Sequence, residues 1–193
     1  MQVKLSQAVK MFFGNSSLEM VFFEAIANAL DAEANEITIS ITAKALNQPE
    51  TLQIEISDNG LGFTNERYNK FSKLFDVEES SHKGLGRLVY LCYFDDVKVI
   101  SNYDKVKVRE FDFNEGFKED NFKSSIVPET KSGTVFKMTS YVLQRIAKNE
   151  YVSADYLKSR ILQEFYSRLF HLKDNGQRVV ININTNIENH KRN

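Results

Sequence analysis

The stretch FFEAIANALDA, residues 22–32, has the composition of a buried helix but includes three polar side chains, those of Glu24, Asn28 and Asp31. At about 100° per residue, the spacing of these three residues places their side chains in one narrow stripe along the helix. Carboxylates are rarely buried without partners, because removing an unpaired carboxylate from water costs several kcal/mol. A helix that belonged wholly to the core would not be expected to carry this stripe.

Length and composition favour a chain with one sizeable core, since 42% of the 193 residues are hydrophobic. The 25 basic and 26 acidic residues nearly cancel, so the charge indicates neither a nucleic-acid partner nor an anionic membrane surface. No apolar run has the length of a membrane span, and residues 1–10 lack the apolar core of a signal peptide. The single cysteine, Cys92, cannot form an internal disulfide. We therefore expect a cytoplasmic protein without a membrane partner.

Apolar periodicity predicts helices and strands along most of the chain. A first helix is expected from about residue 17 to residue 34, with Ser16 and Glu19 spaced as a capping box. Strict alternation then predicts strands at 37–43 and 51–57. The remaining predictions are helices over 65–75, 84–94 and 154–172, strands over 96–101, 105–113, 133–140 and 177–184, and irregular structure over 114–131. This set indicates an α+β fold, a two-layer sandwich whose one mixed sheet is covered by helices on one face.

Three short motifs follow the polar stripe in the chain: DNGLG at 58–62, KGLGR at 83–87 and GT at 133–134. Gly84 and Gly86 at a helix start would expose backbone N–H groups and the positive end of the helix dipole, which suits a phosphate. A plain glycine turn into a buried helix explains the same pattern. Asp58 could accept a hydrogen bond from the amino group of a base, or simply cap its turn.

The stripe itself suggests two chemical roles. Asn28 offers a neutral oxygen to a hard cation such as Mg²⁺, which prefers oxygen ligands. Glu24, one helical turn earlier, is placed to take a proton from a water molecule. The basic residues of KVKVREF, residues 105–111, are instead expected on the solvated face of a strand.

The order and spacing of these motifs resemble those of the GHKL superfamily, the Bergerat-fold ATPases. EAIANALDAEANEITISI at 24–41 is similar to the E-x-x-x-N-x-x-D-A box of MutL, MORC proteins and the heat-shock-ninety chaperones. ISDNGLGF at 56–63 resembles the D-x-G-x-G box, and KGLGRL at 83–88 resembles a shortened second glycine box. SGTVFKM at 132–138 resembles the strand that closes the nucleotide pocket. The resemblance covers about residues 17–140 and implies the Bergerat fold.

The resemblance also implies roles for these residues and makes the stripe one wall of a nucleotide cleft. Asn28 would coordinate Mg²⁺ on the triphosphate of ATP, Glu24 would position the attacking water, and Asp58 would bind the adenine amino group. The other implied binding residues line the phosphates and the base: Gly60, Gly62, Lys83, Gly84, Leu85, Gly86, Arg87 and Thr134. Whether Lys83 and Arg87 reach a phosphate or are solvated stays open, and Asp31 is expected to brace the pocket or the neighbouring backbone.

The implied function is Mg²⁺-dependent binding and hydrolysis of ATP to ADP and phosphate. It would drive a conformational or dimerisation switch, with a second copy or other domains of a larger prokaryotic protein as partners. One alternative is a nucleotide-binding regulatory module with negligible turnover. Another is a histidine-kinase-like phosphotransfer domain, although such kinases usually lack a glutamate at the position of Glu24.

The resemblance divides the chain into an ATP-binding domain over residues 1–145 and a helix-strand extension over 146–193, which could begin a further domain. Residues 63–83 are expected to form a short mobile lid.

Overall fold

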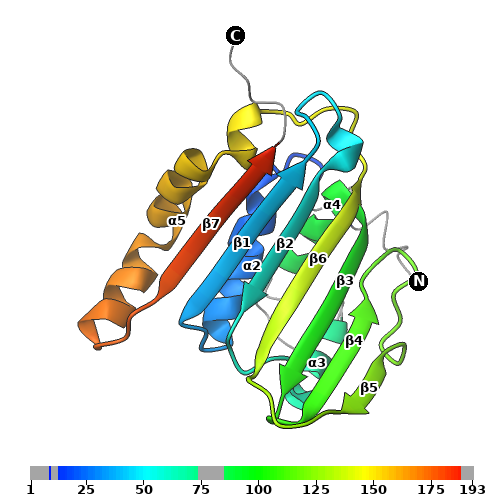
Figure 1. Ribbon diagram of the computed structural model, residues 1–193, viewed down its shortest axis with the longest axis vertical. Helices are drawn as coiled ribbons and strands as arrows, with labels where there is room; N and C mark the ends of the chain where they lie inside the picture. Colours follow the sequence, from blue (N-terminus) through cyan, green and yellow to red (C-terminus); the bar gives the residue numbers. More distant parts are fainter. Residues whose placement is uncertain (1–8, 10–12, 74–84, 188–193) are drawn as a thin grey trace.

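The computed structural model describes residues 9, 13–73 and 85–187. The strands among them form one mixed seven-stranded sheet. The strand order is β5-β4-β3-β6-β2-β1-β7, and every neighbouring pair is antiparallel except β1 and β7, which run parallel (Figure 1). The strands are β1 Glu36–Ala43, β2 Gln53–Asp58, β3 Phe94–Tyr103, β4 Lys107–Asp112, β5 Lys123–Ile126, β6 Gly133–Tyr141 and β7 Val180–Ile187.

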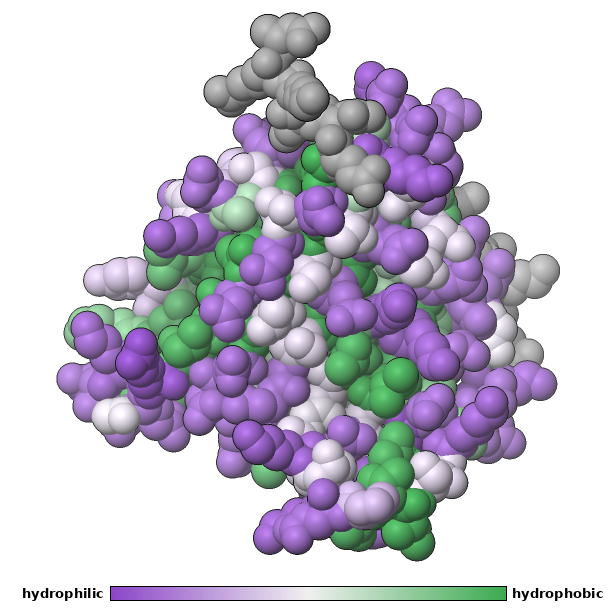
Figure 2. All heavy atoms as spheres, in the orientation of Figure 1, coloured by the Kyte–Doolittle hydropathy of each residue, from purple (hydrophilic) through white to green (hydrophobic). Residues whose placement is uncertain are grey.

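The α-helices lie together on one face of this sheet (Figure 1). They are α2 Glu19–Asp31, α3 Asn65–Ser72, α4 Tyr90–Tyr93 and α5 Ala154–Asp174, accompanied by short 3-10 turns η1 Pro49–Thr51, η2 Gly86–Val89 and η3 Asn149–Val152. The opposite face of the sheet carries mostly hydrophilic side chains (Figure 2). The predicted α+β sandwich with helices on one face is confirmed.

The core lies between the sheet and the helices. It is formed by the alternating inward residues of the strands and the apolar face of the helices. In β1, alternate residues point inward, and Ile37, Ile39 and Ile41 are fully buried. From α2, Phe22 and Ile26 are fully buried on the helical period. Packing these apolar faces together fixes α2 beneath the sheet, because rotating the helix would expose them.

The predicted capping box at the start of α2 is wrong. The N-cap residue is Leu18, and it makes no side-chain cap. The Ser16 hydroxyl instead lies 3.1 Å from the hydroxyl of Tyr93, and the Glu19 carboxylate binds side chains of α5. A charged partner that arrives from a distant helix outcompetes the local backbone bond that the sequence pattern suggested.

Two other elements differ from their predictions. The buried helix expected over 84–94 is shorter, since η2 leads into one turn of α4 and Phe94 already begins β3. Strand β5 lies inside the stretch predicted to be irregular, and all four of its residues are exposed. An edge strand without a buried face has no hydrophobic alternation by which the sequence could reveal it.

The C-terminal elements continue the same sheet and helix layer. β7 pairs with β1 along its whole length, from Glu36 opposite Val180 to Ala43 opposite Ile187. α5 packs on α2, where the rings of Phe23 and Phe165 meet edge to face at 6.2 Å. The division of the chain at residue 145 stays a prediction. No helix in the described residues is long and apolar enough to cross a membrane.

The predicted mobile lid is wrong for its first part. Phe63 and the buried α3 residues Tyr68 and Phe71 join one aromatic cluster with Phe111 of β4. Such packing anchors this part of the segment in the core. Residues 74–84, which include the rest of the predicted lid, lie outside the described residues.

Candidate functional site

The polar stripe of α2 divides into two parts in the structure. Glu24 and Asn28 lie one turn apart, and the Asn28 side-chain amide donates a hydrogen bond of 3.1 Å to Glu24 Oε1. Asp31 instead faces α5, where its carboxylate forms an ion pair of 2.7 Å with Arg168. This contact ties the end of α2 to α5. The expectation that Asp31 braces the pocket or the neighbouring backbone stays a prediction.

Burial raises the pKa of the Glu24 carboxyl. The hydrogen bond from Asn28 and the charge of Arg87 oppose this rise, and the charge of Asp31 adds to it. Gly86 at the start of η2 lies directly against the carboxyl, because a Cβ built on Gly86 would overlap Glu24 Oε2. The second glycine box therefore contacts the predicted base, and a larger residue would displace it.

Asp58 ends β2 and lies opposite Thr134 of β6. The backbone N–H of Gly60 donates to Asp58 Oδ1 at 2.8 Å, so the turn-capping interpretation accounts for one carboxyl oxygen. Burial raises the pKa of Asp58, while the N–H groups of Gly60 and Thr134 and the charge of Arg67 oppose the rise. A carboxyl held in this way at a strand end is suited to accept a hydrogen bond from a ligand amino group.

Ser101 of β3 joins this end of the site, although it belongs to none of the sequence motifs. Its hydroxyl lies 3.2 Å from that of Thr134 and accepts a 2.7 Å hydrogen bond from the backbone N–H of Phe63. Gly62 comes so close to β3 that a Cβ would overlap the carbonyl oxygen of Asn102, and its φ of +71° also favours glycine. Ser101 therefore links the first glycine box to Thr134.

Arg87 is only 5% exposed, so the prediction that it could be solvated is wrong. It donates a 3.0 Å hydrogen bond to the carbonyl oxygen of Lys73 and lies 4.9 Å from the centre of the Phe71 ring. Burial lowers its pKa to about 10, and the charge of Glu24 opposes that change. A phosphate contact by Arg87 stays a prediction. Leu85 is partly buried beside η2, and Lys83 and Gly84 lie outside the described residues.

Arg109 was predicted on the solvated face of its strand, and this is wrong. Its side chain is 3% exposed and lies 4.5 Å from the centre of the Tyr68 ring. It donates hydrogen bonds to the carbonyl oxygen of Phe63 at 2.7 Å and to Asn65 Oδ1 at 2.6 Å. Arg109 therefore holds the segment that follows Gly62. The signal was present in the sequence, because period-two spacing places Arg109 on the same strand face as the buried Phe111.

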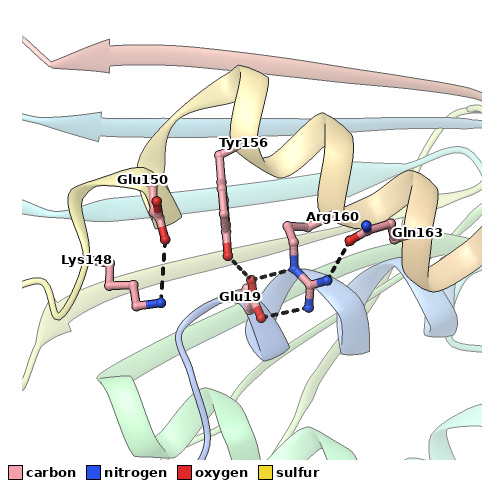
Figure 3. Close-up of polar contacts among 6 residues, drawn as sticks. All are labelled: Glu19, Lys148, Glu150, Tyr156, Arg160 and Gln163. Atoms are coloured by element: carbon pink, nitrogen blue, oxygen red, sulfur yellow. Dashed lines mark hydrogen bonds and ion pairs between the residues drawn. The ribbon is translucent and has the colours of Figure 1, made fainter.

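A second, partly buried polar cluster ties the start of α2 to α5 (Figure 3). The Tyr156 hydroxyl donates to Glu19 Oε2 at 2.9 Å, and Arg160 binds both carboxylate oxygens, at 3.1 and 3.2 Å. Burial opposes ionisation of Glu19, but the hydrogen bonds from Arg160 and Tyr156 outweigh it and lower the Glu19 pKa. Together with the pair of Asp31 and Arg168, this cluster fixes both ends of the helix that carries Glu24 and Asn28.

No cluster of three His, Cys, Asp or Glu side chains suited to a metal ion occurs among residues 13–73 and 85–187. A site that takes one amide oxygen from the protein and the rest from phosphates and waters needs no such cluster. One hollow is lined by residues that include Asn59 and Lys105, and another by residues that include Lys98 and Lys137, and neither lining includes Glu24 or Asn28. A nucleotide cleft above Glu24 and Asn28 therefore stays a prediction.

The model of the family described as histidine kinase-, DNA gyrase B-, and HSP90-like ATPase matches residues 14–140, which is more than half of the chain. The chain belongs to this family. The match begins before α2 and ends in β6, so it spans Glu24, Asn28, Asp58, Gly86 and Thr134. The predicted GHKL membership is confirmed, and membership of an ATPase family implies nucleotide binding.

Solved structures share the fold of this GHKL domain. The ATP-binding domain of topoisomerase IV from Francisella tularensis, in complex with a small-molecule inhibitor, has a TM-score of 0.59 at 16% identity, covering 94% of this chain and 88% of that one. The Aquifex aeolicus MutL ATPase domain complexed with ADP has a TM-score of 0.53 at 16% identity, covering 89% and 61%. The N-terminal domain of a DNA repair protein has a TM-score of 0.50 at 18% identity, covering 87% and 45%.

At these identities the likeness shows the fold alone, and this chain spans about half to three fifths of the DNA repair and MutL chains. No curated protein matches the chain in sequence.

Proposed function

We propose that this GHKL domain binds ATP with Mg²⁺ and hydrolyses it to ADP and phosphate. The observation that carries the proposal is the contact between Glu24, Asn28 and Gly86. It joins a half-buried carboxyl, an amide and a closely approached glycine from two separate motifs. Each motif alone has a structural explanation, but the fold brings them together on one side of α2.

The residues present fit a Mg²⁺ ion bound to a triphosphate. The carboxylate of Glu24 can only accept hydrogen bonds, so Asn28 turns its amino group toward Glu24. The amide oxygen remains as the ligand for the cation, which suits the oxygen preference of Mg²⁺. The ion would neutralise phosphate charge and orient the terminal phosphate.

Glu24 is the proposed general base. It would take a proton from the water whose oxygen forms the new bond to the terminal phosphorus, while the bond to the ADP oxygen breaks. A carboxyl whose pKa is raised by burial is a stronger base than an exposed one, which favours this role near neutral pH.

Asp58 is the proposed adenine receptor, with Thr134 beside it and Gly60 and Gly62 admitting the flat base. Leu85 and Gly86, with Lys83 and Gly84, are proposed to line the phosphates. The selection of Asp58 rests on its place at the strand end opposite Thr134. A carboxylate accepts from the amino group of adenine but is mismatched to the carbonyl oxygen that guanine carries at the corresponding position.

We further propose that ATP changes how the domain associates with a second copy or with other domains of a larger cytoplasmic protein. Membership of the family supports the change in association. The single cysteine supports only the cytoplasmic location, because it favours a reducing compartment. Sedimentation velocity with and without a non-hydrolysable ATP analogue would measure the association directly. An unchanged sedimentation coefficient in the longest available protein would contradict this part of the proposal.

Nucleotide selectivity tests the proposed function. The protein should bind ATP in preference to GTP and release phosphate from ATP in the presence of Mg²⁺. Asp58→Ala should weaken ATP binding about tenfold or more, because a buried charge-assisted hydrogen bond is worth roughly 1.5–3 kcal/mol. Asp112→Ala, at an exposed position on β4, serves as the matched control in calorimetry. Equal affinity for the two nucleotides, or full ATP affinity in Asp58→Ala, would exclude Asp58 as the adenine receptor.

A further inference from the structure

Phe63, the residue after the first glycine box, has both of its backbone groups bound by side chains of the sheet. Its N–H donates to Ser101 Oγ of β3 at 2.7 Å, and its carbonyl oxygen accepts a hydrogen bond from Arg109 Nη1 of β4 at 2.7 Å. Backbone groups are most often satisfied by other backbone groups. Here two buried side chains from neighbouring strands fix this point of the chain instead.

Ser101 is fully buried, and its hydroxyl also contacts the start of β6. The hydroxyl oxygen lies 3.2 Å from the carbonyl oxygen of Gly133 and 3.2 Å from the hydroxyl of Thr134. In the sheet, Ser101 lies opposite Thr134, and Thr134 lies opposite Asp58. Directly paired residues point to the same face of a sheet, so these three side chains form one row. Ser101 therefore connects Phe63 to the row that ends at Asp58.

Neutral oxygens and aromatic rings surround the buried guanidinium of Arg109. It donates hydrogen bonds to the carbonyl oxygens of Phe63 and Thr64 and to the side-chain oxygen of Asn65. It also lies 4.5, 4.8 and 4.9 Å from the ring centres of Tyr68, Phe122 and Tyr103, respectively. Taking a charge out of water costs several kcal/mol, so a buried cation needs such partners. A lysine could not replace it here, because an ammonium group lacks the planar fork that bonds and stacks at once.

The two halves of the proposed site are carried by different elements. Asp58 ends β2, and Gly62 lies in the segment that follows it, whereas Glu24 and Asn28 belong to α2 and Gly86 belongs to η2. The first group is the proposed contact for the base, and the second is the proposed contact for the phosphates and Mg²⁺. A displacement of the segment after β2 would therefore alter binding of the base more than binding of the phosphates.

We propose that Ser101 and Arg109 are positioning residues for the adenine base. By holding both backbone groups of Phe63, they fix the path of the chain after Asp58, and with it the surface that the first glycine box presents to the flat ring. Neither side chain touches the nucleotide in this arrangement. The inference deepens the proposed function and rests on Asp58 as the adenine receptor.

Calorimetry with two ligands tests this assignment. ATP would contact both halves of the site, whereas inorganic triphosphate, measured at the same Mg²⁺ concentration, would contact only the phosphate half. Arg109→Lys keeps the charge and loses the planar fork. We expect the affinity ratio of ATP to triphosphate to fall at least about fivefold, the size of one hydrogen bond to the base. A general loss of stability would weaken both ligands alike, so an unchanged ratio in the folded variant would overturn the inference.

Ser101→Ala is an independent test, because it removes the other contact of Phe63 and leaves Arg109 in place. The affinity ratio should fall in the same way. Arg160→Lys is the matched control, since it alters a partly buried arginine of α5 that binds Glu19. This control should leave the ratio unchanged.

Asp58→Ala separates the inference from the proposed function. If Asp58→Ala lowers the affinity ratio and neither Ser101→Ala nor Arg109→Lys does, only the role of Ser101 and Arg109 is wrong. If Asp58→Ala leaves the ratio unchanged, the proposed adenine receptor is wrong and the inference fails with it.

Hydrogen exchange at the Phe63 amide, measured without nucleotide, tests whether the two side chains act together. Arg109→Lys leaves Ser101, the direct partner of this amide, in place. The amide should nevertheless exchange faster in Arg109→Lys than in the wild type, because release of the carbonyl group makes local opening easier. Exchange at the wild-type rate in the folded variant would overturn the proposal that Arg109 positions this segment.

Discussion

Glu24 and Asp58 illustrate at the scale of single residues how a binding site differs from the core around it. Burial raises the pKa of each carboxyl. Neutral hydrogen-bond donors, rather than a close ion pair, are the main groups that oppose this rise. A site of this kind holds charge ready for a ligand at some cost in stability.

The cost at Glu24 predicts a stabilising substitution. Because the folded pKa of Glu24 is raised, its contribution to stability is complete below the unfolded pKa of about 4.3 and is lost as pH rises through the folded pKa. Glu24→Gln keeps the bond from Asn28 without a charge, so its melting temperature should exceed that of the wild type at neutral pH. The advantage should shrink as pH falls toward 4.

Thermal unfolding followed by circular dichroism between pH 4 and 8 measures this difference. Glu55→Gln, on the exposed face of β2, provides the control for an ordinary surface carboxylate. A Glu24→Gln protein that is less stable than the wild type at every pH would show that the carboxylate is stabilised by the fold, contrary to our account.

At the scale of elements, α5 holds α2 at two points of unequal strength. The Arg160 contact to Glu19 is the more buried, with side-chain exposures of 33% and 11%, whereas the Arg168 pair with Asp31 has exposures of 38% and 63%. Exposed pairs contribute little, but removing one partner from a buried pair leaves an uncompensated charge.

Arg160→Met should therefore lower the unfolding midpoint in urea clearly more than Arg168→Met does. The lowered Glu19 pKa means that its contribution is present above the unfolded carboxyl pKa and is lost as pH falls through the folded pKa. The difference in urea midpoint between the wild type and Arg160→Met should therefore disappear in acid. Equal effects of the two substitutions would contradict the greater strength assigned here to the Arg160 contact.

Prediction from sequence succeeded for elements whose signal is local. Strict alternation located β1 and β2, and helical periodicity located α5. It failed where a distant partner decides the outcome, as at Glu19, whose carboxylate is taken by Arg160 rather than by the helix start. The pairing of β7 with β1 is equally invisible in local patterns, because no periodicity specifies a parallel neighbour.

The residues of the candidate site also differ in whether a local sequence signal marks them. Glu24 and Asn28 were predicted because polar side chains interrupt an apolar helix, and Asp58 because it stands at a strand end before two glycines. Ser101 and Arg109 occupy inward positions of strands, where alternation alone would have marked them as unusual.

At the scale of the whole molecule, the family match ends at residue 140, but the sheet continues through β7. α5 covers α2 through Phe23 and Phe165, and β7 covers the edge of β1. We therefore predict that the fragment 1–145 loses cooperative unfolding, because it exposes an apolar helix face and a strand edge together. A sharp urea transition of the fragment, equal in midpoint to that of the full chain, would show that residues 146–193 are dispensable for folding.

The central claim is that Glu24 acts as the base in ATP hydrolysis, and turnover and binding measured together on Glu24→Gln test it most directly. A general base contributes roughly 10²–10⁴ in rate and little to ground-state affinity. We predict that Glu24→Gln binds ATP with Mg²⁺ as tightly as the wild type does, while its phosphate release falls at least about a hundredfold. Glu55→Gln should match the wild type in ATP affinity and in phosphate release. Phosphate release that survives in Glu24→Gln would contradict the account and leave Glu24 a structural residue.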